Sequence, residues 1–272
     1  MANKNFKKTN NEILYHKEIL IKLNPIKIKT KRKIFDLFET IISSKFKFRD
    51  YDILVISSKF VSMSEGSVLD LRKIKPSNKA KELAGIYQME PTLVEAVIRE
   101  SDIIFGGLPG FLLTIRNGIL APNAGIDKSN VPSNNIICLP NDAFLSAEIL
   151  RLEFLTILGK RVGIVISDSR LMPTRIGTTG VAIGCAGIEP IEDQRGNKDL
   201  FGHVLKYTLK ATADSLATMG TFVMGESNES IPVVVIRGIN ISFTDRKLSW
   251  KDLAIDYNTD IYFRSIQKSR IL

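Results

Sequence analysis

Three acidic residues lie in loops of small and polar residues, each directly beside an apolar run. They are Asp127 in PNAGIDKSN (122–130), Asp168 in ISDSR (166–170) and Glu226 in MGESNES (224–230). Because strands bring their ends to one rim of a sheet, these carboxylates are placed to converge. Carboxylates, together with a hydroxyl such as that of Ser169, are ligands that Mg²⁺ and Mn²⁺ prefer. The alternative is that each acid only forms a turn or caps a helix.

A run of closely spaced glycines, GTTGVAIGCAG (177–187), follows Arg175. Such glycines let backbone N–H groups approach an anion, and an arginine can hold a carboxylate or phosphate in a bidentate pair. The chain contains no P-loop, and the run lacks the spacing of a dinucleotide-binding fingerprint. Tight packing in a bent strand pair explains the glycines equally well.

A lysine, Lys59, follows Ser57 and Ser58 at the end of an expected strand. Its ammonium group there can contact a polyphosphate as a point charge, although most exposed lysines bind no ligand. The two histidines, His16 and His203, are isolated in the sequence and make neither a zinc site nor a Ser-His-Asp arrangement. We expect His203 to lie in the first turn of a helix.

The elements that must position these residues follow from apolar periodicity. The expected strands are 19–28, 51–57, 135–140, 161–167 and 232–236, with a hairpin at 111–122 around Asn117-Gly118. The expected helices are 33–43, 77–86, 91–100, 142–158 and 203–218, and residues 57–66 are expected to form a polar loop closed by glycine. Interspersed helices and strands with many hairpin connections predict an α+β fold of mixed and antiparallel sheets with flanking helices.

The formal net charge of +9 is concentrated at the N-terminus. Residues 1–34 contain ten Lys and Arg against two Glu, which leaves +1 for the other 238 residues. This segment lacks interleaved aromatic residues at a stacking spacing, so a solvated basic tail is favoured over a nucleic-acid-binding arm. Residues 1–15, rich in Asn and Lys, are predicted to be disordered, and residues 16–272 to form the folded domain.

No apolar run approaches the roughly 20 residues of a membrane span, and the N-terminus lacks the apolar core of an export signal. The two cysteines, Cys138 and Cys185, lie in apolar surroundings far apart in the sequence. This favours two buried free thiols over a disulfide. Together these features predict a cytoplasmic protein.

Several of these segments occur together in an order and spacing that resemble the coenzyme F420:L-glutamate ligases. The segments are VISSKFVSMSEG (55–66), PNAGIDKSN, VGIVISDS, GTTGVAIGCAGIEP, DQRGNKDLFG (193–202), MGESNES and IPVVVIRG (231–238). The resemblance runs from about residue 20 to about residue 240 and is densest over 120–238. It implies an F420 ligase-like fold of two intertwined subdomains and a homodimer with the site near the interface. It also implies a GTP-dependent ligase that adds L-glutamate to a deazaflavin precursor through an acyl phosphate.

By motif position, the resemblance also assigns roles to individual residues. Asp127 and Asp168 would bind one divalent ion, Mg²⁺ or Mn²⁺, and Ser169 and Glu226 a second, with K⁺ as a further cation. Arg175 is the candidate catalytic residue. The residues implied in nucleotide binding are Ser58, Lys59, Asn130, Met224, Gly225, Glu226 and Ser227.

The departures from the family fall on motifs that face ligands, while the framework is kept. The family residues that are replaced are Lys at Met63, Thr at Ser169, Arg at Met172, Trp at Thr174, Gln at Thr178 and Gln at Glu226. Arg170 lies close enough in sequence to take the place of the missing arginine. Two alternatives to the F420 glutamyl ligase therefore stay open. One is a divergent ligase that forms an amide on another carboxylate, and the other is a non-catalytic nucleotide- or nucleic-acid-binding relative.

Overall fold

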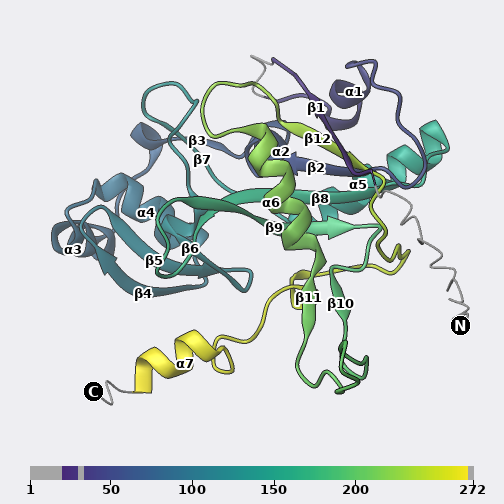
Figure 1. Cartoon of the computed structure of the whole chain (residues 1–272). Helices are drawn as coiled ribbons and strands as arrows, with labels where there is room; N and C mark the ends of the chain where they lie inside the picture. The colour runs from purple at the N-terminus through teal and green to yellow at the C-terminus, as the bar shows by residue number, and fades with distance from the viewer. Residues whose placement is uncertain (1–19, 30–33, 269–272) are drawn as a thin grey trace, which may run out of the picture.

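The structure, a computed structural model, describes residues 20–29 and 34–268 (Figure 1). The predicted tail at residues 1–15 lies outside these ranges. The central element is a five-stranded sheet in the order β1-β12-β2-β8-β9. Its strands are β1 (Lys22–Ile26), β2 (Ile53–Ser57), β8 (Gly163–Leu171), β9 (Thr178–Ala186) and β12 (Val233–Arg237). Strands β2 and β8 pair in parallel and the other neighbours pair antiparallel, so the prediction of a mixed sheet in an α+β fold is confirmed.

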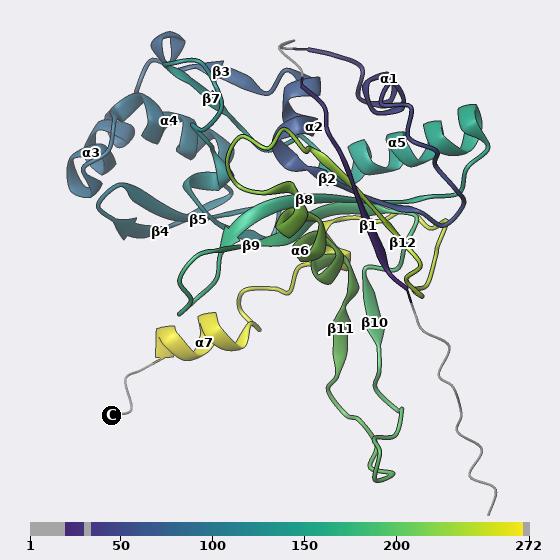
Figure 2. The ribbon, with the colours of Figure 1, turned by 45° about the horizontal axis from the view of Figure 1, so that its top comes forward.

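Helices cover both faces of this sheet (Figure 2). Helices α1 (Leu37–Ile42), α2 (Ser58–Glu65) and α5 (Ala143–Leu158) pack on one face, and α6 (Thr212–Met224) packs on the other. In β2, Leu54 and Ile56 belong to the first core, whereas Ile53 and Val55 belong to the second. Burial on both faces explains why this strand is an uninterrupted apolar run in the sequence.

The segment between α2 and α5 forms a second, smaller part beside one end of the sheet (Figure 1). It has its own apolar cores and two small sheets, β3-β7 and β4-β5-β6. Asn117 and Gly118 both have positive φ, 48° and 73°, so the predicted hairpin turn is confirmed. The elements are β3 (Val68–Asp70), η1 (Leu71–Lys73), α3 (Asn78–Tyr87), α4 (Pro91–Glu100), β4 (Ile103–Leu108), β5 (Phe111–Arg116), β6 (Ile119–Pro122), η2 (Asn123–Gly125) and β7 (Asn135–Ile137).

A long hairpin, β10 (Ile191–Asp193) and β11 (Leu209–Ala211), projects away from the body of the molecule (Figures 1 and 2). Large apolar side chains of this hairpin are open to solvent, with Leu200, Phe201 and Tyr207 each more than 85% exposed. The C-terminal region contains η3 (Trp250–Asp252) and α7 (Ile261–Lys268).

The prediction of a polar loop at 57–66 is wrong, because these residues form helix α2. Ser58, Val61 and Ser62 share one buried face, and Gly66 ends the helix with a positive φ of 76°. The spacing of these three residues is helical, but two of them are serines, so an apolar count does not detect the face. The buried hydroxyl of Ser62 bonds back to the carbonyl of Ser58, which lets a polar residue occupy the core side.

The predicted helix at 203–218 begins later, at Thr212, and continues to Met224. Residues 209–211 are instead drawn into β11 by antiparallel pairing with β10, a contact between distant segments that local periodicity does not reveal. His203 therefore lies in the hairpin and not in a helix. Its backbone N–H and ring Nδ1 contact the Asp199 carboxylate at 2.8 and 3.1 Å.

The glycine run 177–187 forms β9 and the turn beside it. A Cβ at Gly180 would lie 2.5 Å from the carbonyl oxygen of Ala217 on α6, and a Cβ at Gly184 would lie 2.5 Å from the carbonyl carbon of Ala143 on α5. These two glycines allow helices on both sides to approach the strand. For these two glycines the packing interpretation is confirmed, and anion binding by the run stays a prediction.

Both cysteines are free and buried, as predicted. Burial raises the pKa of each thiol to about 12, so neither is a thiolate nucleophile near neutral pH. Within residues 20–29 and 34–268, no helix is both long and apolar enough to cross a membrane.

Candidate active site

A cavity of about 650 Å³ opens at the carboxyl ends of the parallel strands β2 and β8. Open sheets commonly bind ligands in such a crevice. The cavity brings together four segments that are far apart in sequence: the start of α2, the loop after β6, the outer half of β8 and the loop before β12. The predicted site residues that line it are Ser58, Lys59, Asp127, Asn130, Asp168, Ser169, Met224, Gly225, Glu226 and Ser227.

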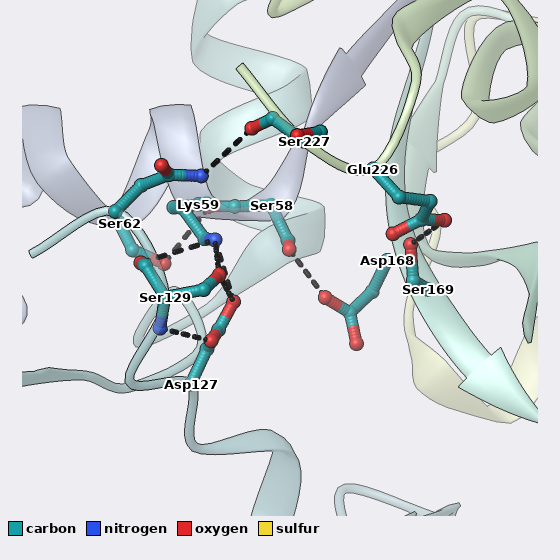
Figure 3. A network of polar contacts seen from close by, with 10 residues as sticks. Ser58, Lys59, Ser62, Asp127, Ser129, Asp168, Ser169, Glu226 and Ser227 are labelled. Carbon is teal, nitrogen blue, oxygen red and sulfur yellow. Dashed lines mark hydrogen bonds and ion pairs between the residues drawn. The ribbon is translucent and has the colours of Figure 1, made fainter.

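Asp168 lies in the cavity wall, where it accepts a hydrogen bond from the Ser58 hydroxyl (Figure 3) and lies beside the Arg170 guanidinium. The Ser58 hydroxyl donates to Asp168 Oδ1 at 2.5 Å, and Arg170 Nε lies 3.1 Å from Asp168 Oδ2. Asp168 is within β8, because this strand continues to Leu171 and does not end near Ser167 as predicted. Residues two apart in a strand share a face, so Asp168 and Arg170 point the same way while Ser169 points to the other side.

Asp127 forms a second polar cluster with Lys59 and Ser129 (Figure 3). Lys59 Nζ lies 2.6 Å from Asp127 Oδ2 and 2.7 Å from the Ser129 hydroxyl. The backbone N–H of Ser129 donates to Asp127 Oδ1 at 2.6 Å, which closes a local Asx turn. Burial acts to raise the pKa of Asp127, but hydrogen bonds from Lys59 and Ser129 outweigh it, so the pKa lies below its usual value. This carboxylate is therefore charged at neutral pH.

Glu226 closes the cavity from the loop before β12. Its Oε1 accepts a hydrogen bond from Ser169 at 2.8 Å (Figure 3) and another from Thr178 at 3.3 Å. The Asn130 amide donates to the Ser227 carbonyl at 3.1 Å and so joins this loop to the Asp127 loop. Asp127, Asp168 and Glu226 thus line one cavity, in agreement with the prediction that these three carboxylates converge.

Helix α2 points its N-terminus into the cavity, since both Ser58 and Lys59 are in its first turn and line the wall. The preceding residue, Ser57, makes no side-chain cap. The first N–H groups of a helix have no partner inside the helix and attract anions. An anionic group of a ligand is therefore favoured at this wall.

The donor set suits a hard cation, because the acids and hydroxyls of the wall supply oxygen only. Among the described residues, no three His, Cys, Asp or Glu side chains lie close enough to share one ion. A cation of the Mg²⁺ type would bind here through one or two carboxylates and keep several waters.

Arg175 is the one predicted site residue that does not line the cavity. It lies in the exposed loop between β8 and β9, so its catalytic role stays a prediction. Two residues that sequence reasoning missed are Ser129 and Glu229; the Glu229 carboxylate accepts the Ser227 N–H at 2.9 Å. The Asp-x-Ser spacing at 127–129 is a signal for the Asx turn, whereas nothing local marks Glu229.

A cavity with a helix N-terminus, carboxylates and hydroxyls is suited to an anionic small molecule held with a cation. The chain belongs to the F420-0:gamma-glutamyl ligase family, whose sequence pattern matches residues 25–238. It is 36% identical over 220 residues to the coenzyme F420:L-glutamate ligase of Methanopyrus kandleri, and 41% identical over 220 residues to that of Methanocaldococcus jannaschii. Each match covers 80% of this chain and 87% of the relative. A third such ligase, from Methanococcus maripaludis, is 42% identical over 203 residues, 74% of this chain and 82% of the relative.

Proposed function

We propose that this chain is a coenzyme F420:L-glutamate ligase that forms an amide between the amine of L-glutamate and a carboxylate of the F420 precursor. GTP is the energy source in this proposal. The terminal phosphoryl group of GTP is transferred to the carboxylate to give an acyl phosphate and GDP. The glutamate amine then attacks the acyl carbon, the amide bond forms, and inorganic phosphate leaves.

The observation that carries this proposal is the cavity itself, in a chain 36–42% identical to relatives named as such ligases. Acids from three distant segments line one wall region together with Lys59 and the N-terminus of α2. In the proposal, the ammonium group of Lys59 and the first N–H groups of α2 bind nucleotide phosphates. Asn130 and the 224–227 loop, which are already joined by a hydrogen bond, hold the rest of the nucleotide.

The charge of the cavity supports a role for divalent cations. Among the described residues, three cationic side chains line it, Lys29, Lys59 and Arg170, against four acids, Asp127, Asp168, Glu226 and Glu229. The described lining thus has a net formal charge of −1, which by itself would not favour a nucleoside triphosphate. We propose that Asp127, Asp168, Ser169 and Glu226 hold Mg²⁺ or Mn²⁺, which when bound would neutralise phosphate charge. K⁺ as a further cation and a cytoplasmic location stay predictions.

The function is tested by incubating the full chain with GTP, MnCl₂, L-glutamate and the F420 precursor. We expect GDP release that depends on the precursor, and a product heavier by one glutamyl residue in mass spectrometry. Replacing GTP by ATP in a parallel reaction tests the nucleotide. GDP release with a different carboxylic acid, and none with the precursor, would favour the divergent ligase. Absence of both GDP and product under all conditions would contradict a ligase function.

We also propose that the chain forms a homodimer through the β10–β11 hairpin. Large apolar side chains of this hairpin, such as Phe201 and Tyr207, are 86% and 88% exposed, and a projecting apolar arm is typical of a surface covered by a partner. Changing both to Ser is expected to convert a dimer to a monomer in size-exclusion chromatography with light scattering. The matched control is Leu108→Ser, since Leu108 is 73% exposed on β4, outside the hairpin. A wild-type chain that is monomeric at micromolar concentration would overturn the proposal.

A further inference from the structure

Arg170 is buried in the cavity wall with donors that have no acceptor. The residue is only 4% exposed, yet it lines the cavity. Among the described residues, neither Nε nor Nη2 of its guanidinium makes a hydrogen bond. Asp168 Oδ2, at 3.1 Å from Nε, is a close charge but is not aligned as an acceptor.

Two other arginines of this chain show how a guanidinium is satisfied when its role is structural. Arg151, whose side chain is 7% exposed, donates from Nε and Nη2 to both oxygens of Glu148 at 2.7 Å. Arg237 donates to both oxygens of Asp52 at 2.6 Å. These are the bidentate pairs that arginine and carboxylate usually form. Arg170 has no such pair, although burying a charged group without hydrogen-bond partners is unfavourable.

Asp168 does not complete the pair because its other oxygen, Oδ1, accepts the Ser58 hydroxyl. The side chain of Asp168 is therefore shared between α2 and β8, and one edge of the guanidinium is left without an acceptor. A planar guanidinium with free N–H groups matches the oxygens of a carboxylate or a phosphoryl group.

We propose that Arg170 forms an oxyanion subsite in this cavity, where its guanidinium donates to a carboxylate or phosphoryl group of a bound ligand. The inference shares one assumption with the proposed function, namely that ligands bind in this cavity. Among the described residues that line the cavity, Arg170 supplies a buried and permanently charged donor, whereas the side chain of Lys59 is 25% exposed. The subsite thus determines which end of the ligand lies beside Asp168.

The test is binding of oxyanions to the full chain in the presence of EDTA, measured by thermal unfolding over a concentration series. The probes are inorganic pyrophosphate for the phosphoryl source and L-glutamate for the carboxylate source. The chains compared are the wild type, Arg170→Gln, Arg170→Lys and Arg72→Gln. Arg72 is a matched control because its side chain is 70% exposed and pairs with Asp70, outside the cavity.

We expect at least one probe to raise the Tm of the wild type and of Arg72→Gln, with the apparent Kd weakened about 10-fold or more in Arg170→Gln. Arg170→Lys keeps the positive charge but loses the planar pair of N–H donors, so its affinity for the probe should lie between those of Arg170→Gln and the wild type. The probe that loses affinity identifies the class of oxyanion. If no probe raises the Tm of the wild type, or if Arg170→Gln responds as the wild type does, the subsite does not exist and Arg170 is only a counter-ion of Asp168.

Failure of this inference can be told apart from failure of the proposed function. Anion binding that depends on Arg170, in a chain that makes no glutamyl product, would leave the subsite standing and remove the ligase. The opposite result would be an Arg170→Gln chain that makes the glutamyl product with unchanged KM for GTP, L-glutamate and the precursor. That result would support the ligase function and exclude the subsite.

Discussion

Asp168→Asn is expected to lower kcat/KM for glutamyl transfer on the order of 100-fold, the usual effect of removing one preorganised electrostatic group. The substitution keeps the size of the side chain but removes the negative charge that lies between Ser58 and Arg170. It also removes one of the carboxylates proposed to hold a divalent cation. We therefore expect a higher Mn²⁺ concentration for half-maximal rate, measured by varying MnCl₂ at saturating GTP.

The control for this prediction is Asp70→Asn, because Asp70 is paired with Arg72 and does not line the cavity. It should leave the rate and the Mn²⁺ dependence within about twofold of the wild type, as surface substitutions usually do. Thermal unfolding of both variants checks that the fold is intact. An Asp168→Asn chain with wild-type rate and metal dependence would show that this carboxylate has no part in the reaction.

Gly184→Ala is expected to destabilise the fold by about 3 kcal/mol, the upper part of the usual range for overpacking a core. A Cβ at this position would lie 2.5 Å from the carbonyl carbon and 2.6 Å from the carbonyl oxygen of Ala143, at the first residue of α5. Backbone atoms at a helix start cannot rotate away as a side-chain tip can, so either α5 or β9 must shift. Urea unfolding followed by circular dichroism measures the change.

The matched control is Gly85→Ala in α3, where a Cβ would meet nothing within 4 Å. Alanine has the higher helix propensity, so this substitution should stabilise the protein by about 0.5–1 kcal/mol. The same chemical change is thus expected to have opposite signs at the two positions. Equal effects of the two substitutions would contradict the close packing of β9 against α5.

Much of the fold could be predicted from local pattern. The strand at 51–57 and the helices at 77–86, 91–100 and 142–158 match β2, α3, α4 and α5 closely, because each has a strong apolar period or run. Apart from helix α2, whose buried face contains serines, the errors described above occur where long-range pairing decides the structure. Pairing with β10 places residues 209–211 in a strand and not in the predicted helix. Pairing with β9 continues β8 beyond its apolar run, through polar residues, as far as Leu171.

Sequence pattern indicated most of the residues that line the cavity, but not their contacts. Asp127, Asp168 and Glu226 stood out because each polar loop borders an apolar strand. The sequence could not show that Ser58 would hold Asp168, since the two residues are 110 positions apart and meet only because β2 and β8 pair in parallel. Arg170 was noted only as a neighbour of a missing arginine, because burial without an acceptor is a property of the packed structure.

The position of β12 has a consequence for how the chain folds as it is synthesised. This strand comes last along the chain among the five of the main sheet, yet it lies inside it, between β1 and β2. Until residues 233–237 have left the ribosome, β1 has no partner in the sheet and β2 presents an unpaired apolar edge. Pairings across such long sequence separations form slowly, and unpaired edges aggregate, so incomplete chains should depend on chaperones. The Glu226 loop directly precedes this strand, so the cavity that it lines is among the last parts of the molecule to form.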